Sequence, residues 1–213
     1  VPTQKVQLTA DSVLTLPQEG KDLGNGLLNA FHVPADKMLI AISVRKWQED
    51  DSYLLELAKA ADLLAEEYNA HIVLLPLQYP VDMEACRRLQ HFMRQTAAST
   101  VLETACDTEQ FLSLMGNFDL LIGMRLHALI FAAVMELPFV AVSYDPKIDG
   151  FVKDINGINA GKVEELQAAQ VVAAVHKALA PETSAHGMLD KLRAKALLNA
   201  QEAFELLSRG DVR

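Results

Sequence analysis

Short runs of apolar residues alternate along this chain with longer stretches in which apolar residues recur at helical spacing. The first clear run, MLIAISVR, spans residues 38–45, and the second, HIVLLPLQ, spans 71–78. Continuous apolar runs of this length are typical of strands buried on both faces of a parallel sheet. The stretch 50–68 between them predicts a helix, because its apolar residues fall on one side: Tyr53, Leu54, Leu57, Ala60, Ala61 and Leu64.

The alternation continues to the end of the chain. We expect further strands at TVLE (100–103), DLLIG (119–123), LPFVAVS (137–143) and, shorter, within GINAGK (157–162). We expect helices over 81–97, over 107–117 with Asp107 as N-cap, from Met124, after Lys147, over 163–180 and over 185–207. Strands alternating with helices predict an α/β fold with a doubly wound, mainly parallel, Rossmann-like sheet.

The two ends of the chain differ from this central part. Residues 1–37 show no long periodicity; VLTLP (13–17) predicts a short strand, and 21–37 carries the glycines and proline of a connection. We therefore expect a linker or the remnant of a preceding lobe over 1–37, one sheet domain over 38–184, and a C-terminal helix in 185–213. The apolar face of that helix either packs on this domain or crosses to a neighbouring lobe; its members are Leu189, Leu192, Ala196, Ala200, Phe204 and Leu207.

Amino-acid composition and net charge indicate which classes of protein and partner fit this chain. Hydrophobic residues make up 51% of the 213 residues, enough for a sizeable core, and the net charge of −9 argues against nucleic acid as a general partner. No apolar run reaches the ~18 residues of a membrane span, so we expect a cytoplasmic, not transmembrane, protein. Cys86 and Cys106 lack metal-ligand or CxxC spacing, which favours free thiols. The histidines show no ligand spacing either, and the sequence predicts no metal and no cofactor.

Ligands of such sheets bind outside the carboxyl ends of the strands. The first strand is followed by VRKWQED and not by a GxGxxG loop, which weighs against an ordinary dinucleotide site. The candidate ligand-binding residues at the strand ends are Ser43, Arg45, Trp47, Gln78, Gly123, Arg125, His127, Ser143, Tyr144, Asp145 and Lys147.

Arg125 and His127 stand where DLLIG turns into a helix. A helix N-terminus is partly positive, so two cations there oppose the dipole, and a bound anion would offset this. In a regular helix these two positions point about 200° apart. They can share a ligand only if Arg125 still lies on the loop, which Gly123 permits. The competing interpretation of His127 is a hydrogen-bonded core histidine; Arg45 and Lys147 could be ordinary surface residues.

Arg45, Arg125, His127 and Lys147 would all meet at one edge of the predicted sheet. Up to four positive charges in a protein of net charge −9 would form a basic pocket in an acidic surround. Arginine binds carboxylate and phosphate through paired hydrogen bonds. The pocket therefore suits a small anion that carries several charges.

At GMRLHALIFAA (123–133) followed by LPFVAVSYDPKIDGF (137–151), the chain resembles the polysaccharide pyruvyl transferase family. It is most similar to the bacterial enzymes that pyruvylate secondary cell-wall polymers, which anchor S-layer proteins. The resemblance runs from about Asp11 to the C-terminus and includes AISVR, HIVLLPLQYP and DLLIGMRLHA. Members of the family resemble two-lobed GT-B glycosyltransferases. This chain would be the C-terminal lobe, truncated or cleaved from an N-terminal lobe, and inactive alone.

The resemblance implies phosphoenolpyruvate as donor and a lipid-linked saccharide, such as one carrying N-acetylmannosamine, as acceptor. The product would be a 4,6-pyruvate ketal, with release of phosphate, made at the inner face of the membrane. Residues matching the family's donor-binding positions are Arg45, Arg125, Leu126 and Lys147, and His127 matches its catalytic histidine; Ser43, Trp47, Gln78, Gly123, Ser143, Tyr144 and Asp145 are further candidates.

Two other functions are compatible with the same pattern. One is the donor lobe of a GT-B nucleotide-sugar glycosyltransferase, for which Asp145, Asp149 and Asp154 could reach ribose hydroxyls beyond the fifth strand. The other is a noncatalytic anion-binding module.

Overall fold

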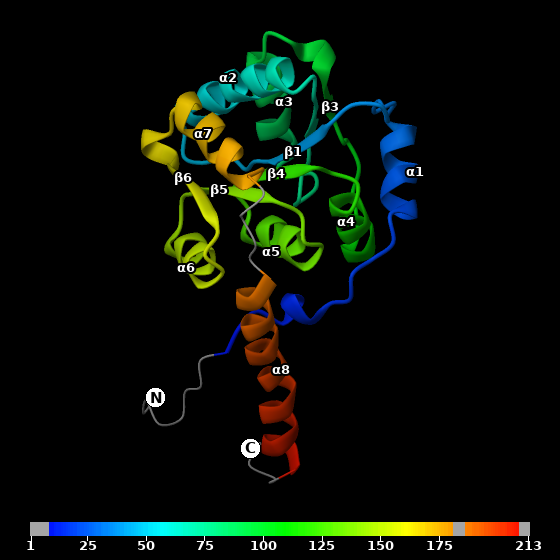
Figure 1. Ribbon diagram of the computed structural model, residues 1–213, viewed down its shortest axis with the longest axis vertical. Helices are drawn as coiled ribbons and strands as arrows, with labels where there is room; N and C mark the ends of the chain where they lie inside the picture. The colour runs from blue at the N-terminus through cyan, green and yellow to red at the C-terminus, as the bar shows by residue number, and fades with distance from the viewer. Residues whose placement is uncertain (1–8, 181–185, 209–213) are drawn as a thin grey trace.

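A parallel sheet of six strands forms the centre of the computed structural model, which describes residues 9–180 and 186–208 (Figure 1). The strand order is β3-β2-β1-β4-β5-β6. The strands are β1 (Leu39–Ser43), β2 (His71–Leu74), β3 (Ser99–Val101), β4 (Leu120–Gly123), β5 (Phe139–Ser143) and β6 (Ile158–Lys162). The order reverses between β1 and β4, where a ligand crevice is expected at the carboxyl ends. The predicted doubly wound Rossmann-like sheet is confirmed.

Alternation along each strand divides the core into two layers. In β1, Ile40 and Ile42 enter one hydrophobic cluster, whereas Leu39 and Ala41 enter the other. All of β1, β2 and β4 is buried, so both faces of the central strands need apolar side chains. This explains why the sequence shows continuous apolar runs and not a two-residue period.

Helices cover both faces of the sheet (Figure 1). The first cluster packs against α2 (Ser52–Glu67), α3 (Met83–Phe92) and α7 (Ala168–Ala178). The second packs against α1 (Asp22–Ala30), α4 (Thr108–Met115), α5 (Leu126–Val134) and α6 (Pro146–Asp154). Short 3-10 turns lie at η2 (Ser12–Thr15), η3 (Thr96–Ala98) and η4 (Val163–Glu165). The predicted N-cap Asp107 is confirmed as part of a capping box with Gln110.

The first part of the chain is more ordered than its pattern indicates, and two predictions there are wrong. VLTLP is not a strand: Asp11 accepts from the backbone N–H of Val13 and starts the 3-10 turn η2. Residues 21–37 are not a plain connection, because they contain α1. Gly24 allows α1 to lie against α4, where its backbone N–H donates to the hydroxyl of Ser113 at 2.8 Å. Whether residues 1–37 derive from a preceding lobe stays a prediction.

The last helix, α8 (His186–Ser208), belongs only partly to the core. Leu189, Leu192 and Ala196 are buried in the second cluster, and the helix contacts η2. Farther along, Phe204 is 72% exposed, and the helix extends away from the body of the molecule (Figure 1). The predicted apolar face therefore packs over its first half only. The side chain of Leu207 lies outside the described part.

Two smaller expectations concern the cysteines and the membrane. Cys86 and Cys106 are free, as predicted. Within residues 9–180 and 186–208, none of the helices combines the length and apolar character that a membrane crossing requires.

Candidate anion-binding site

A cavity of about 530 Å³ opens at the carboxyl ends of the central strands. All four cationic candidates, Arg45, Arg125, His127 and Lys147, line it. The remaining lining residues come from the loops after β2 and β3, from α4 and α5, and from the end of β5: Leu77, Gln78, Cys106, Asp107, Thr108, Phe111, Leu126, Phe131 and Tyr144. The tertiary structure thus brings together residues as far apart in sequence as Arg45 and Lys147.

The backbone at the start of α5 has the irregular form that a shared ligand requires. Arg125 occupies the N-cap position in an extended conformation (φ −85°, ψ 124°), and the regular helix begins at Leu126. The side chains of Arg125 and His127 can therefore face the same cavity. His127 is 54% exposed, so it is not a core histidine.

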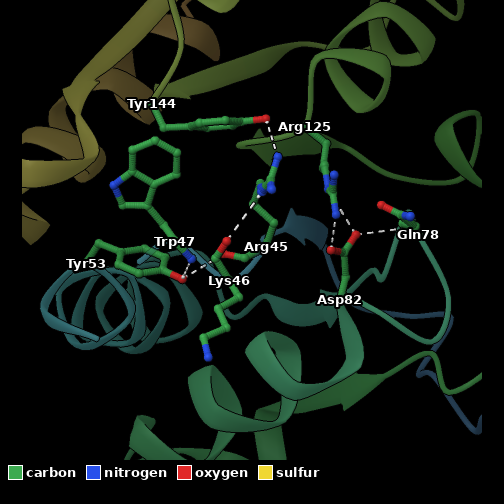
Figure 2. Close-up of polar contacts among 8 residues, drawn as sticks. All are labelled: Arg45, Lys46, Trp47, Tyr53, Gln78, Asp82, Arg125 and Tyr144. Atoms are coloured by element: carbon green, nitrogen blue, oxygen red, sulfur yellow. Dashed lines mark hydrogen bonds and ion pairs between the residues drawn. The ribbon is translucent and has the colours of Figure 1, made fainter. Parts of the chain in front are cut away.

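Arg125 is held by a buried carboxylate (Figure 2). Its Nε and Nη2 donate to the two carboxylate oxygens of Asp82, with Nε 3.1 Å from Oδ2. Asp82 is fully buried, and its Oδ2 also accepts the backbone N–H of Gln78 at 2.9 Å. Sequence reasoning did not single out Asp82, because an aspartate before a helix resembles an ordinary N-cap.

Arg45 sits among aromatic side chains at the other side of the cavity (Figure 2). Its Nη1 donates to the hydroxyl of Tyr144 at 2.9 Å, and its guanidinium carbon lies 4.9 Å from the centre of that ring. Trp47 packs against Tyr144 with ring centres 4.8 Å apart. The Tyr53 hydroxyl donates to the backbone carbonyl of Arg45 at 2.7 Å. Burial raises the pKa of Tyr53 to about 12, so this donor stays protonated.

His127 and Lys147 each lie near a carboxylate. Nε2 of His127 is 3.4 Å from Asp11, which reaches the site from η2, and Nζ of Lys147 is 3.6 Å from Asp145. Both pairs are partly open to solvent, where such contacts contribute little to stability. Both side chains line the cavity, where a ligand can reach them.

Three helices begin at the cavity, and they differ in their capping. The first turn of each helix contributes to the cavity lining: Thr108 from α4, Leu126 and His127 from α5, and Lys147 from α6. Asp107 caps α4 and Asp145 caps α6, whereas α5 has no side-chain cap. Uncapped N–H groups at a partly positive helix end favour an anion.

Some of the predicted site residues lie next to the cavity but do not line it. Ser43, Gly123 and Ser143 are buried at the strand ends and do not line the cavity, and neither do Trp47 and Asp145. The indole Nε1 of Trp47 is buried, so this residue is a packing partner of Tyr144. The sequence reasoning also missed Cys106 and Thr108, whose only signal was their place after the third strand. Among the described residues, no cluster of His, Cys, Asp or Glu has metal-site geometry.

Several solved structures share this fold. UDP-GlcNAc 2-epimerase from Methanocaldococcus jannaschii has a TM-score of 0.68 at 10% identity, over 96% of this chain and 57% of that chain. ADP-heptose LPS heptosyltransferase II of E. coli has a TM-score of 0.59 at 14% identity, over 76% and 52% respectively. The chain thus spans about half the length of these relatives. Such low identities establish the GT-B-like fold alone.

One further structure matches over most of both chains. It is the C-terminal domain of a group 1 glycosyl transferase family protein from Francisella tularensis, with a TM-score of 0.53 at 15% identity, over 87% of this chain and 93% of that chain. No curated protein gives a significant match. The sequence pattern of the polysaccharide pyruvyl transferase family, however, matches residues 1–146. The chain therefore belongs to the polysaccharide pyruvyl transferase family.

Proposed function

We propose that this chain binds phosphoenolpyruvate for transfer of its pyruvyl group to a sugar of a lipid-linked cell-wall polysaccharide precursor. The sugar is N-acetylmannosamine in this proposal, and the products are a 4,6-pyruvate ketal and phosphate. The observation that carries the proposal is the gathering of three cationic side chains, Arg45, Arg125 and Lys147, and of His127 around one cavity in a protein of net charge −9. Family membership supports polysaccharide pyruvyl transfer as the general reaction.

The donor matches the cavity in charge. Phosphoenolpyruvate carries a carboxylate and a phosphate on a three-carbon frame, and each needs its own hydrogen-bond donors. Arg45 and Arg125 line the cavity as separate guanidinium groups, and Lys147 provides a third cation. The backbone at Leu126 starts the uncapped helix α5, whose N–H groups suit a phosphate or carboxylate oxygen.

His127 is the proposed general acid. In the reaction it gives a proton to the methylene carbon, which leaves C2 electron-poor; one sugar hydroxyl then adds to C2 and its proton returns to His127. The second hydroxyl forms the other C2–O bond as the C2–O bond to the phosphate breaks, and its proton leaves on the phosphate as hydrogen phosphate, which completes the ketal. Arg45, Arg125 and Lys147 stabilise the charge on the leaving phosphate.

The test is His127→Ala in the full-length enzyme. We expect ketal formation to be lost while phosphoenolpyruvate still binds. His176→Ala is a matched control, because His176 also pairs with a carboxylate, Glu67, but lies on α7 away from the cavity. Near-normal turnover in the His127 variant would refute the assignment.

A nucleotide-sugar transferase lobe is the main competitor, because one similar solved structure, Alr3699/HepE of Anabaena, holds UDP and glucose. The carboxylates suited to ribose do not support it. Asp149 and Asp154 do not line the cavity, Asp149 accepts from Asn159 at 3.1 Å, and Asp145 caps α6. Competition between phosphoenolpyruvate and UDP-sugars in a binding assay separates the two functions.

The whole enzyme, in this proposal, has an N-terminal lobe that completes the cleft, and its lipid-linked acceptor brings it to the inner face of the membrane. An isolated chain of this kind is inactive, and mixing it with the N-terminal lobe restores ketal formation. If no activity returns, a noncatalytic anion-binding role for the isolated chain becomes the better explanation.

A further inference from the structure

We propose that Asp82 is a positioning residue for donor binding, which acts by fixing the orientation of Arg125. This inference rests on the proposed function, because it assigns the donor's anionic group to the outer edge of that guanidinium. Asp82 does not line the cavity, so its effect on the donor is indirect and passes through Arg125.

The carboxylate of Asp82 is buried, and its main partner is the guanidinium of Arg125. It is 0% exposed, and its partners are Nε and Nη2 of Arg125 and the backbone N–H of Gln78. Asp82 holds the N-cap position of α3, where an aspartate usually accepts from the first turn, yet it makes no side-chain cap hydrogen bond. The carboxylate faces the guanidinium of Arg125 instead (Figure 2).

The contact uses one particular edge of the guanidinium. A guanidinium is a planar fork with more N–H donors than the two that Asp82 engages. Because Asp82 takes the side edge formed by Nε and Nη2, the donors of the end edge are Nη1 and the second N–H of Nη2, and these have no hydrogen-bond partner among the described residues. Arg125 lines the cavity and its side chain is only 15% exposed, so few other orientations are open to it. The end edge can then meet a carboxylate or phosphate through two parallel hydrogen bonds.

Asp82 also changes the charge of the site, which makes the inference sharply testable. The Asp82–Arg125 pair has no net charge, and Lys147 also lies near a carboxylate, that of Asp145. The excess positive charge therefore comes chiefly from Arg45, which pairs with no carboxylate among the described residues. Neutralising Asp82 would make the site more positive. Simple electrostatics then predicts that Asp82→Asn binds an anion more tightly, whereas loss of positioning predicts weaker binding. The two explanations differ in the sign of the effect.

The experiment measures phosphoenolpyruvate affinity by calorimetry for the wild type, Asp82→Asn, Arg125→Ala and the double variant. We expect Asp82→Asn to weaken binding about 10- to 100-fold, the size expected for a lost charge-assisted hydrogen bond. In the Arg125→Ala background it should have no further effect, because the residue it positions is gone. In the full-length enzyme KM should rise and kcat should fall, because a misoriented Arg125 also stabilises the leaving phosphate less well.

Asp119→Asn is the matched control, since Asp119 also holds a backbone N–H, that of Leu39 at 2.7 Å, but at the opposite end of the sheet. Arg125→Lys is the second variant, for use if Asp82→Asn does not fold. It keeps the positive charge and loses the fork, so we expect it to weaken binding as Asp82→Asn does. Unchanged or tighter binding in Asp82→Asn would overturn the inference, and the same holds for Arg125→Lys if that variant has to replace it. Additive losses of affinity in the double variant would overturn it as well.

Inorganic phosphate and UDP distinguish this failure from failure of the proposed function. If either binds the wild type and phosphoenolpyruvate does not, the proposed donor is wrong, and the same series with the bound anion still tests Asp82. If none of the three binds, Arg125 has no anion to meet, and both proposals fail.

Discussion

The hydroxyl of Tyr144 accepts a 2.9 Å hydrogen bond from Nη1 of Arg45, and the same ring lies against the guanidinium, 4.9 Å from its central carbon. Tyr144 follows β5, whereas Arg45 follows β1, so the contact joins two loops at the carboxyl edge of the sheet. One aromatic residue thus fixes one of the cavity's cations both by a hydrogen bond and by its ring face.

We expect Tyr144→Phe to weaken phosphoenolpyruvate binding about 2- to 10-fold, because it removes one hydrogen bond to Arg45 and keeps the ring. Tyr144→Ala should cost more, since the cation–π contact and the packing of Trp47 are lost as well. Lys46→Ala is the control: Lys46 pairs with Glu49 at 3.0 Å and does not line the cavity. Tighter binding in Tyr144→Phe would show instead that the hydroxyl competes with the donor for Arg45.

Two glycines in α1 should respond oppositely to alanine. A Cβ at Gly24 would lie 2.6 Å from backbone atoms of Ser113 and Leu114 in α4, whereas one at Gly26 would meet nothing within 4 Å. Gly24→Ala should lower the free energy of unfolding by about 1–3 kcal/mol through overpacking. Gly26→Ala should raise it by up to about 1 kcal/mol through helix propensity. Urea denaturation measures both, and equal effects would contradict the close approach of α1 and α4.

The two halves of α8 can be compared with a pair of leucines. Leu192 is 6% exposed and Leu197 is 55% exposed on the same helix. Leu192→Ala should lower the free energy of unfolding by about 2–5 kcal/mol, the usual cost of emptying a core position. Leu197→Ala should change it by less than about 0.5 kcal/mol in this chain. Similar small losses for both would mean that α8 does not dock on this domain in solution.

Stability should fall on the acid side because of His71, which is buried at the start of β2 with Nε2 2.9 Å from the Thr100 hydroxyl. Burial, helped by Lys37, lowers the pKa of His71 below its ordinary value of 6.5. The unfolded chain therefore binds this proton more readily, and stability decreases as pH falls below about 6.5. His71→Gln should flatten that part of the curve of unfolding free energy against pH.

Much of the fold could be predicted from the sequence, because the central strands are buried on both faces and their apolar runs are unmistakable. The helical spacing of apolar residues over 50–68 predicts a helix, and all the apolar residues named there are buried in α2. The prediction failed for α1, where Gly24 and Gly26 indicate a connection. A glycine that permits close helix packing and one in a turn look the same in sequence, and only the position of α4 separates them.

For the site, the sequence identified the cations and their common edge, since strand ends in a parallel sheet meet on one side. It could not identify Asp82, Asp11 or Tyr144 as their partners, because these contacts join residues 43, 116 and 99 positions apart. The hydrophobic pattern by itself determined the parallel sheet and the place of its ligand crevice, as burial of whole strands demands an apolar sequence. Only the tertiary structure decided how each guanidinium is held, because side-chain orientation depends on neighbours that the local sequence does not specify.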